Sequence, residues 1–401
     1  MNILFIGRAC PLETAYQILC QSGKNPGYQI IKFMNLILQG FACHQQKSTV
    51  ISNISNPNQF YTHLKKEEEN GIQYQYLPTI QIPILSQFCH AFFSFLYTLK
   101  WGLKTKGDKI IFCDIIASSS SCSGALIAAR LLNIKKCMLL TDMITTPVTT
   151  ALDTKKWWWK FFLKRRVRNQ QNALKKYDSF VFLTKQMNDV YNPLNQPFVV
   201  MEGSVDHHFI PNSTIVKKEP RVILYAGAID ALYGFNELVQ AFMTLSTPDI
   251  ELHIYGSGKF VNQLLEYQKQ DPRIRYMGTV SNEQIVLEEQ KATLLVNPRL
   301  SHHEFVKYSF PSKTSEYMLS GTPLLTTKLA GIPNEYLEYL YLFEGETKEG
   351  FAKKLQEVLS LSSEELHQKG LDAQNFVLSQ KNNIIQSQKI LDLFNKIILN
   401  R

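Results

Sequence analysis

The sequence has little that could build a disulfide-linked, metal-bound or membrane-spanning protein. Its cysteines number seven, an odd count, and no two of them form a CxxC pair. This pattern argues against a disulfide framework or a zinc site and indicates a reducing cytosol. No run of about 18 apolar residues occurs, so we expect no membrane span. The first ten residues lack the charged start and long apolar core of a signal peptide, and we interpret them as a buried strand.

Disordered and low-complexity segments are also missing. Of the 401 residues, 45% are hydrophobic and 19% are charged, which is typical of a globular protein. The chain is longer than one ordinary domain, and we expect two.

The charge is unbalanced, with a net charge of +9. Such a protein can bind nucleic acid, an anionic small ligand or a membrane surface. No nucleic-acid-binding motif accompanies the charge, so nucleic acid is not an expected partner. Lysines and arginines crowd the segment Lys155–Lys176, mixed with Trp157, Trp158, Trp159, Phe161 and Phe162.

This basic and aromatic segment is typical of a membrane interface, where Trp lies at headgroup level and Lys and Arg meet anionic lipid. Phe88–Trp101, also rich in aromatic residues, is a second candidate. The alternative is that the aromatic residues pack in the core and the charges form a solvated face. We expect a cytoplasmic protein that lies peripherally on the inner face of the cell membrane.

The N-terminal half alternates between strand-like and helix-like segments, which is typical of a parallel sheet with helices on both faces. We expect strands at Ile3–Ile6, Thr49–Ile51, Lys109–Phe112, Cys137–Leu140 and Ser179–Leu183. We expect helices at Leu12–Gln21, Phe88–Leu103, Ser123–Leu132 and Lys155–Tyr177. The run Ser118–Ser121 is expected to end a strand and cap the third of these helices.

Pro193–Pro220 is rich in proline, and we interpret it as a linker, because the alternation restarts at Val222. The expected fold class is α/β, with two doubly wound, Rossmann-like domains that face a cleft. We place the N-terminal domain at residues 1–205 and the second domain at residues 206–381. A final helix within residues 382–401 is expected to pack back on the first domain.

The stretch Phe310–Pro323, FPSKTSEYMLSGTP, is the most informative part of the sequence. Short apolar runs flank it, so the whole predicts strand, loop, helix and strand. Pro311 and Ser312 mark the helix start, and Lys313 and Glu316 project from one face of its first turn. Free N–H groups and a lysine there suit a phosphate, and a carboxylate one turn deeper suits sugar hydroxyls. The alternative is that the Pro-Ser pair is only a helix cap.

The residues Phe310–Tyr336, FPSKTSEYMLSGTPLLTTKLAGIPNEY, resemble the donor-site segment of retaining glycosyltransferases of the two-domain GT-B type, like those of family 4 that build bacterial surface polysaccharides. Arg221–Phe242, Glu251–Phe260 and Arg273–Ile285 resemble the first three strands of the same domain with the loops and helix that follow them. The resemblance covers about residues 220–340, and the N-terminal half only in general layout.

The resemblance implies an enzyme, a hexosyltransferase-type glycosyltransferase, that moves a sugar from a nucleotide-diphosphate donor to a saccharide acceptor with retention at the anomeric carbon. The implied acceptor is lipid-linked, in the synthesis of capsule, exopolysaccharide or lipopolysaccharide. Two alternatives stay open. One is a non-catalytic partner subunit of a glycosyltransferase, and the other is a nucleotide-sugar epimerase or hydrolase of the same fold.

Glycines after the expected strands could bring backbone close to the donor. They are Gly227 and those of the loop Gly256-Ser257-Gly258, in which Val261 takes the place of a third glycine. A tight turn without a ligand is the alternative role.

Arg299, Glu304, Lys307 and Lys313 lie within fifteen residues and are expected to face the cleft. Preorganised cations and helix N-termini stabilise the charge on a departing diphosphate. We expect Lys307 and Lys313 to have this catalytic role. Arg299 and the helix start at Ser312–Thr314 would bind the donor.

Two further acidic residues complete the expected site. Glu316 would bind the ribose. Asp142 follows an expected strand in the N-terminal half and would contact the acceptor or hold the donor sugar; its alternative role is that of a loop or helix-cap aspartate. We expect no metal or other cofactor, because the chain contains no Asp-x-Asp pair and His302-His303 lacks spaced partner ligands.

The chain departs from the family pattern at three places. Tyr308 stands where many relatives have the first of two glutamates, so contact to the donor sugar must come from elsewhere, with Glu304 as the candidate. Ala228 and Tyr233 stand nearest to the places of an Arg and a Lys that bind diphosphate in relatives. Of a glycine pair in the first N-terminal loop, only Gly7 is present.

Overall fold

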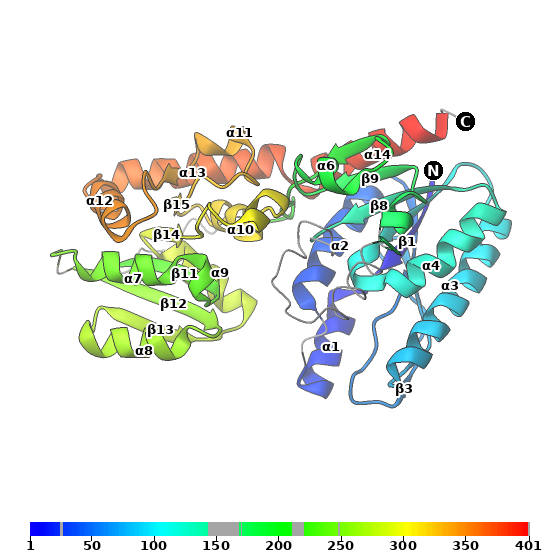
Figure 1. Cartoon of the computed structure of the whole chain (residues 1–401), viewed down its shortest axis with the longest axis horizontal. Helices are drawn as coiled ribbons and strands as arrows, with labels where there is room; N and C mark the ends of the chain where they lie inside the picture. The colour runs from blue at the N-terminus through cyan, green and yellow to red at the C-terminus, as the bar shows by residue number, and fades with distance from the viewer. Residues whose placement is uncertain (25–26, 143–167, 170, 211–219, 248, 400–401) are drawn as a thin grey trace. The chain divides into compact units, whose positions relative to one another are not determined.

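The computed structural model describes residues 1–24, 27–142, 168–169, 171–210, 220–247 and 249–399 (Figure 1). The chain divides into two compact units. Unit 1 consists of Met1–Ser204 and Asn383–Arg401, and unit 2 consists of Val205–Asn382. Each unit is built on its own mainly parallel sheet. The predicted α/β class with two doubly wound sheets is confirmed.

The sheet of unit 1 has eight strands in the order β10-β9-β8-β7-β1-β2-β5-β4. All neighbours pair in parallel except β4 and β5, which are antiparallel. The strands are β1 (Asn2–Gly7), β2 (Lys47–Ser52), β4 (Glu67–Glu69), β5 (Ile72–Tyr76), β7 (Lys109–Asp114), β8 (Lys135–Leu140), β9 (Ser179–Phe182) and β10 (Phe198–Val200). A separate antiparallel pair joins β3 (Tyr61–Thr62) to β6 (Thr79–Ile80).

The helices of unit 1 are α1 (Leu12–Ser22), α2 (Tyr28–Cys43), α3 (Pro83–Lys104), α4 (Ile115–Leu131), α6 (Met187–Tyr191) and α14 (Asn383–Leu399). The final helix, α14, packs against α2, although more than 300 residues separate them in the sequence. Gly40 makes this possible, because a Cβ there would lie 2.3 Å from the carbonyl oxygen of Asn383. The buried ring of Phe394 contacts those of Phe41 and Phe112, with centroids 5.9 Å and 5.4 Å away.

The sheet of unit 2 has six parallel strands in the order β13-β12-β11-β14-β15-β16. They are β11 (Arg221–Ala228), β12 (Ile250–Ser257), β13 (Ile274–Gly278), β14 (Leu294–Asn297), β15 (Leu324–Thr326) and β16 (Tyr341–Leu342). The chain moves outward from β11 to β13 on one side and then from β14 to β16 on the other. The strand order therefore reverses between β11 and β14, and ligands bind such sheets at the carboxyl ends of the strands at this point.

The helices of unit 2 are α7 (Phe235–Met243), α8 (Val261–Gln270), α9 (Asn282–Lys291), α10 (Ser312–Leu319), α11 (Asn334–Leu337), α12 (Lys348–Leu359) and α13 (Ser363–Gln380). Two short 3₁₀ helices, η1 (Ala231–Tyr233) and η2 (Glu304–Tyr308), follow β11 and β14. The core between sheet and helices is apolar, with Ile223, Leu252, Val296 and Phe351 fully buried.

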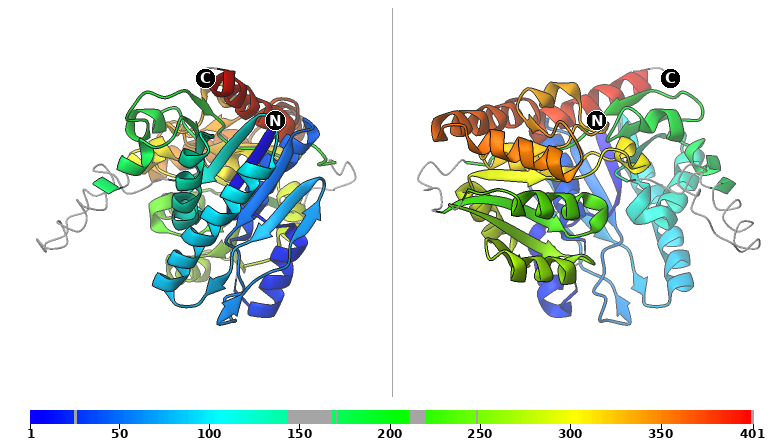
Figure 2. Two further views of the ribbon diagram at one scale, coloured as in Figure 1. Left: turned by 90° about the vertical axis from the view of Figure 1, so that its right-hand side faces the viewer. Right: turned by 60° about the vertical axis from the view of Figure 1, so that its left-hand side comes forward.

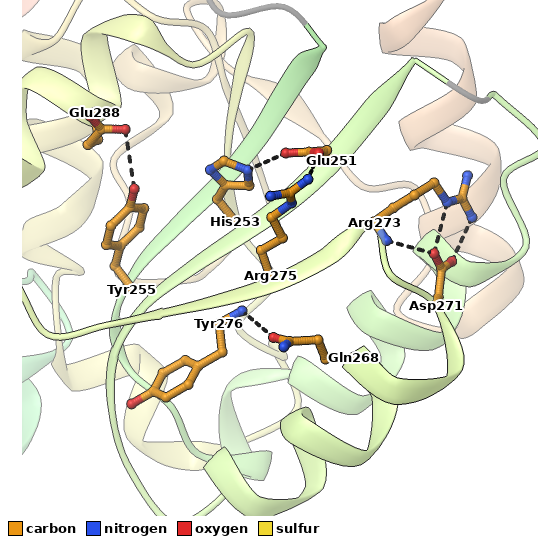
Figure 3. A network of polar contacts seen from close by, with 9 residues as sticks. All are labelled: Glu251, His253, Tyr255, Gln268, Asp271, Arg273, Arg275, Tyr276 and Glu288. Carbon is orange, nitrogen blue, oxygen red and sulfur yellow. Dashed lines mark hydrogen bonds and ion pairs between the residues drawn. The ribbon is translucent and has the colours of Figure 1, made fainter.

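A polar network ties the outer strands of unit 2 together (Figure 3). Arg273 donates to Asp271 over 2.7 and 3.0 Å and to the carbonyl oxygen of Leu245 over 2.8 Å. Its guanidinium also lies 5.0 Å from the ring centroid of Phe242. The buried His253 on β12 lies 2.7 Å from the carboxylate of Glu251. This network stabilises β12 and the edge strand β13.

Two sequence predictions need correction. Ser118–Ser121 does not end a strand or cap a helix, because α4 already begins at Ile115, directly after β7. Serines are tolerated inside this helix since their hydroxyls can bond back to the preceding turn, as Ser123 does to the carbonyl oxygen of Ser119 over 2.9 Å. The supposed linker contains β10, which extends the sheet of unit 1. The predicted helix Lys155–Tyr177 and its basic, aromatic segment lie mostly outside the described residues.

Across the described residues, no helix is both long and apolar enough to cross a membrane.

Candidate donor site in the C-terminal unit

The loops after β11 and β12 approach each other so closely that only glycine fits. The two strands pair with Gly227 opposite Gly256. A Cβ on Gly256 would lie 1.8 Å from the carbonyl oxygen of Gly227, and one on Gly258 would lie 2.0 Å from that of Ile229. Ile229 also accepts a hydrogen bond from the backbone of Phe260 over 3.1 Å. Gly256 and Gly258 thus have a structural role in joining the two loops.

Gly227 has a different neighbour, the side chain of Lys313. A Cβ on Gly227 would lie 2.1 Å from Cε and 2.7 Å from Nζ of Lys313. The missing side chain therefore leaves the space in which the lysine lies. Because Gly227 is the second-last residue of β11 and Lys313 belongs to the first turn of α10, the contact brings this lysine to the carboxyl edge of the sheet.

Two tyrosine rings support the ammonium group of Lys313. Its Nζ lies 5.7 Å from the ring centroid of Tyr225 on β11 and 5.6 Å from that of Tyr317, one turn later on α10. The hydroxyl of Tyr317 accepts from the backbone N–H of Ala226 over 2.8 Å and donates to its carbonyl oxygen over 3.1 Å. This anchors α10 to β11. Burial raises the pKa of Tyr317 well above its usual value, so the phenol stays neutral.

Neither tyrosine was predicted from the sequence as a site residue. Tyr317 lies four residues after Lys313 on the same helix, a spacing that places side chains together and could have revealed it. Tyr225 comes from a different element, and no local pattern could have shown it.

The other residues of the α10 start lie as follows. Pro311 is the N-cap residue, and Ser312 is exposed. Thr314 is fully buried, so its hydroxyl does not face solvent, and its backbone N–H donates to the carbonyl oxygen of Pro311 over 2.9 Å. Glu316 is half-buried. The first N–H groups of a helix have no partner within it, which leaves the end of α10 free to meet an anion.

Arg299 connects the two loops that flank the switch point. It follows β14, and its guanidinium lies 4.6 Å from the ring centroid of Phe305 in η2 and 5.5 Å from that of Tyr233 in η1. It also donates to the hydroxyl of Ser309 over 3.4 Å. Phe305 is a further residue that the sequence analysis did not single out.

Lys307 and Glu304 form an ion pair on the exposed side of η2, 2.8 Å apart. The hydrogen bond between them lowers the pKa of Glu304 and raises that of Lys307. Tyr308 donates to the same carboxylate over 3.3 Å. Lys307 would have to leave this pair before it could contact a diphosphate.

Asp142 belongs to unit 1. It is exposed and follows β8 after Thr141, and the residues from 143 to 167 lie outside the description.

The histidine pair His302-His303 is engaged by stacking and charge. The two rings lie 4.1 Å apart, and that of His303 stacks on Phe305 at 5.4 Å. Burial, with the nearby His302 and Arg299, lowers the pKa of His303. Among the described residues, no three acidic, histidine or cysteine side chains gather in a way that could hold a metal ion.

Comparison with known proteins finds matches to part of the chain and to its whole fold. Residues 220–361 match the family model described as "Glycosyl transferases group 1". The matched region contains the whole sheet of unit 2 and the start of α10. No curated protein matches the chain.

Solved structures match along the full length. Sucrose-phosphate synthase from Thermosynechococcus elongatus has 13% identity and a TM-score of 0.68 over 100% of both chains. HepE from Anabaena, solved with UDP and glucose, has 13% identity and a TM-score of 0.64 over 99% of this chain and 100% of its own. A glycosyltransferase from Rickettsia africae has 14% identity and a TM-score of 0.67 over 100% of this chain and 99% of its own. The fold is therefore that of the GT-B glycosyltransferases, and the match of residues 220–361 to the group 1 glycosyltransferase model supports a transferase enzyme.

Proposed function

We propose that this protein transfers a sugar from a nucleotide-diphosphate donor to a saccharide acceptor, and that the donor diphosphate binds at Lys313. The observation that carries the proposal is the place of this lysine in the first turn of α10, beside Gly227 and over two tyrosine rings. Within the described part of the chain, no carboxylate forms an ion pair with it. A half-buried cation at a helix N-terminus, without an anionic partner, suits a diphosphate.

The first donor to test is a UDP-sugar, because HepE was solved with UDP and glucose. Its ribose would contact Glu316, which shares the helix face of Lys313 one turn further on. A carboxylate accepts hydrogen bonds from both ribose hydroxyls.

The reaction needs stabilisation of the charge that develops on the departing diphosphate. Lys313 and the backbone N–H groups at the start of α10, at Ser312, supply this stabilisation directly. Lys307 adds a second cation once its pair with Glu304 opens. Arg299, held over Phe305, gives the site further positive potential. These groups act without a metal ion, and the reaction retains the anomeric configuration.

The acceptor that we propose is a lipid-linked saccharide in the synthesis of a bacterial surface polysaccharide. The net charge of +9 and the basic, aromatic segment Lys155–Lys176 support a peripheral place on the inner face of the cell membrane. Asp142, on unit 1, would contact the acceptor or the transferred sugar.

The direct experiment is calorimetric titration of UDP into the Lys313→Met variant. Loss of one charge-assisted contact is worth about 1.5–3 kcal/mol, so UDP affinity should fall about tenfold to a hundredfold. Lys269→Met, on the exposed surface of α8, is the matched control and should leave UDP binding unchanged. A folded Lys313→Met protein that binds UDP like the wild type would exclude the proposed site.

Glu316 is tested by removing hydroxyls from the ligand. UDP should bind the wild type more tightly than 2′,3′-dideoxy-UDP, and Glu316→Gln should reduce this preference by roughly 1.5–3 kcal/mol. An unchanged preference in the variant would mean that the ribose lies elsewhere.

Lys307, one of the two lysines proposed to be catalytic, is paired with Glu304. This pair favours a second candidate, a nucleotide-binding partner subunit without catalysis of its own. In that case UDP would bind at Lys313, but no donor would yield transfer until a second protein was added.

A further inference from the structure

Helix α3 of unit 1 buries its small and polar residues and exposes many of its large apolar ones. Its buried positions are His90, Ser94, Thr98 and Gly102, which recur every fourth residue and are small or polar. They allow α3 to lie very close to α4: a Cβ on Gly124 would come within 1.9 Å of the carbonyl oxygen of Ala91. The two helices run side by side in all views (Figures 1 and 2).

A row of large apolar residues of α3 is exposed instead. Ile84, Phe88 and Phe92 are 79%, 77% and 55% exposed, and Leu96 continues the series at the same spacing. An ordinary surface helix has the opposite arrangement, with its apolar stripe on the core. An exposed row of this size marks a contact surface.

The β3–β6 pair extends this surface. The backbone N–H of Gln81 donates to the carbonyl oxygen of Phe60 over 2.8 Å, which places Phe60 and Tyr61 near the start of α3. Phe60 is 68% exposed and Tyr61 is 54% exposed. We call the exposed set the apolar face; it consists of Phe60, Tyr61, Ile84, Phe88, Phe92 and Leu96.

The charged residues of α3 and α4 themselves have one sign. Neither α3 nor α4 contains an acidic residue, whereas both carry basic residues near their ends, which are Lys100, Lys104 and Arg130. Lys100 also lines a hollow of about 420 Å³ together with Lys65, Lys66, His63 and Tyr97. Phe88 and Lys104 lie about 24 Å apart along the helix, so apolar residues occupy one end and cations the other.

We propose that the apolar face inserts into an anionic lipid bilayer, with Lys100 and Lys104 at the headgroups. Aromatic and aliphatic side chains with lysines beside them are typical of such an interface. A second copy of the chain is the alternative occupant: parallel pairing of two α3 helices would bring their basic ends near each other, whereas antiparallel pairing would not.

The position of the face agrees with the proposed function, on which this part of the inference rests. Helix α3 begins just after β5 and β6, at the edge where the parallel strands of unit 1 end. Ligands bind such sheets at this edge. A lipid-linked acceptor would therefore meet unit 1 where the apolar face touches the membrane.

The test is sedimentation of the full-length protein with vesicles of phosphatidylcholine containing about 30% phosphatidylglycerol. Phe88→Ser combined with Phe92→Ser should lower partitioning about tenfold or more, because two large apolar side chains leave the bilayer. The control is Leu265→Ser with Leu287→Ser, two exposed apolar residues of unit 2, at 37% and 43%. It should partition like the wild type.

Lys100→Gln combined with Lys104→Gln should remove the preference for anionic over neutral vesicles. Unchanged partitioning of the Phe88/Phe92 variant would overturn the proposal. So would a wild-type dimer that the same changes convert to a monomer, since the face would then join two copies. UDP affinity, measured on these variants, should stay at the wild-type value, so a failure here is distinct from a failure of the donor site.

Discussion

Lys313 can lie beside Gly227 because this glycine has no side chain. A methyl group at this position would come within 2.1 Å of Lys313 Cε, and the backbone φ of +153° is rare for other residues. The rings of Tyr225 and Tyr317 lie beside its ammonium group, 5.7 and 5.6 Å from Nζ to the centroids. The place of Lys313 in the proposed donor site thus depends on the missing Cβ of Gly227.

Replacing Gly227 with Ala should weaken UDP binding about tenfold or more, because the ammonium group is displaced from its place. Calorimetry measures the change. Gly278→Ala is the control, since Gly278 also has a positive φ, +73°, but no atom within 4 Å of the added Cβ. In the Lys313→Met background the Gly227→Ala change should have little further effect on affinity. Full additivity of the two changes would argue against their contact.

At the scale of elements, the helices α3 and α14 show that two apolar helices can differ in which residues they bury. Both are rich in apolar residues and of similar length. The apolar residues of α14, such as Phe394, are buried against α2 and the sheet. In α3 a row of apolar residues, such as Phe88 and Phe92, is exposed, because small and polar residues occupy the side that packs closely on α4.

The Asp271–Arg273 pair at the start of β13 predicts how the stability of the protein depends on pH. The Arg273 guanidinium holds the pKa of Asp271 below its ordinary value of 3.8. A folded-state pKa below the unfolded one gives stability that is complete above about pH 4 and is lost as the pH falls through the folded-state value.

The stability difference between the wild type and Asp271→Asn should therefore shrink between about pH 5 and about pH 3. Urea unfolding at each pH measures it. Asp249→Asn serves as control, because the Asp249–Arg221 pair is more exposed and should matter less throughout. A difference that does not change with pH would mean that the Asp271–Arg273 pair does not set this part of the stability.

At the scale of the whole molecule, nucleotide binding should raise the apparent stability of the native protein by mass action. A ligand at a hundred times its dissociation constant adds about 2.7 kcal/mol. We expect UDP to raise the melting temperature more than GDP, ADP or CDP at equal concentration. Thermal unfolding across this panel measures the preference, with Lys313→Met as the variant that should lose the shift. An equal shift from every nucleotide would exclude recognition of uracil.

A feature could be predicted where residues close together in the sequence determine it. The strands β1, β7, β11 and β14 are short apolar runs bounded by polar residues, and the sequence indicated all of them. The start of α10 was equally local, since Pro311 and Ser312 mark it. In contrast, α2 and β5 were not predicted, and α4 was placed eight residues too late, because serine does not reliably mark a helix start.

The amino-acid sequence alone determined the two doubly wound sheets and the helix that carries Lys313 and Glu316, because periodicity and capping are properties of neighbouring residues. Only the tertiary structure decided that Lys313 lies in the space beside Gly227, that Lys307 is paired with Glu304, and that α3 turns its apolar side outward. Each of these outcomes depends on which side chains and backbone atoms meet across elements or turns, and contact distances of a few ångströms are not written in local sequence patterns.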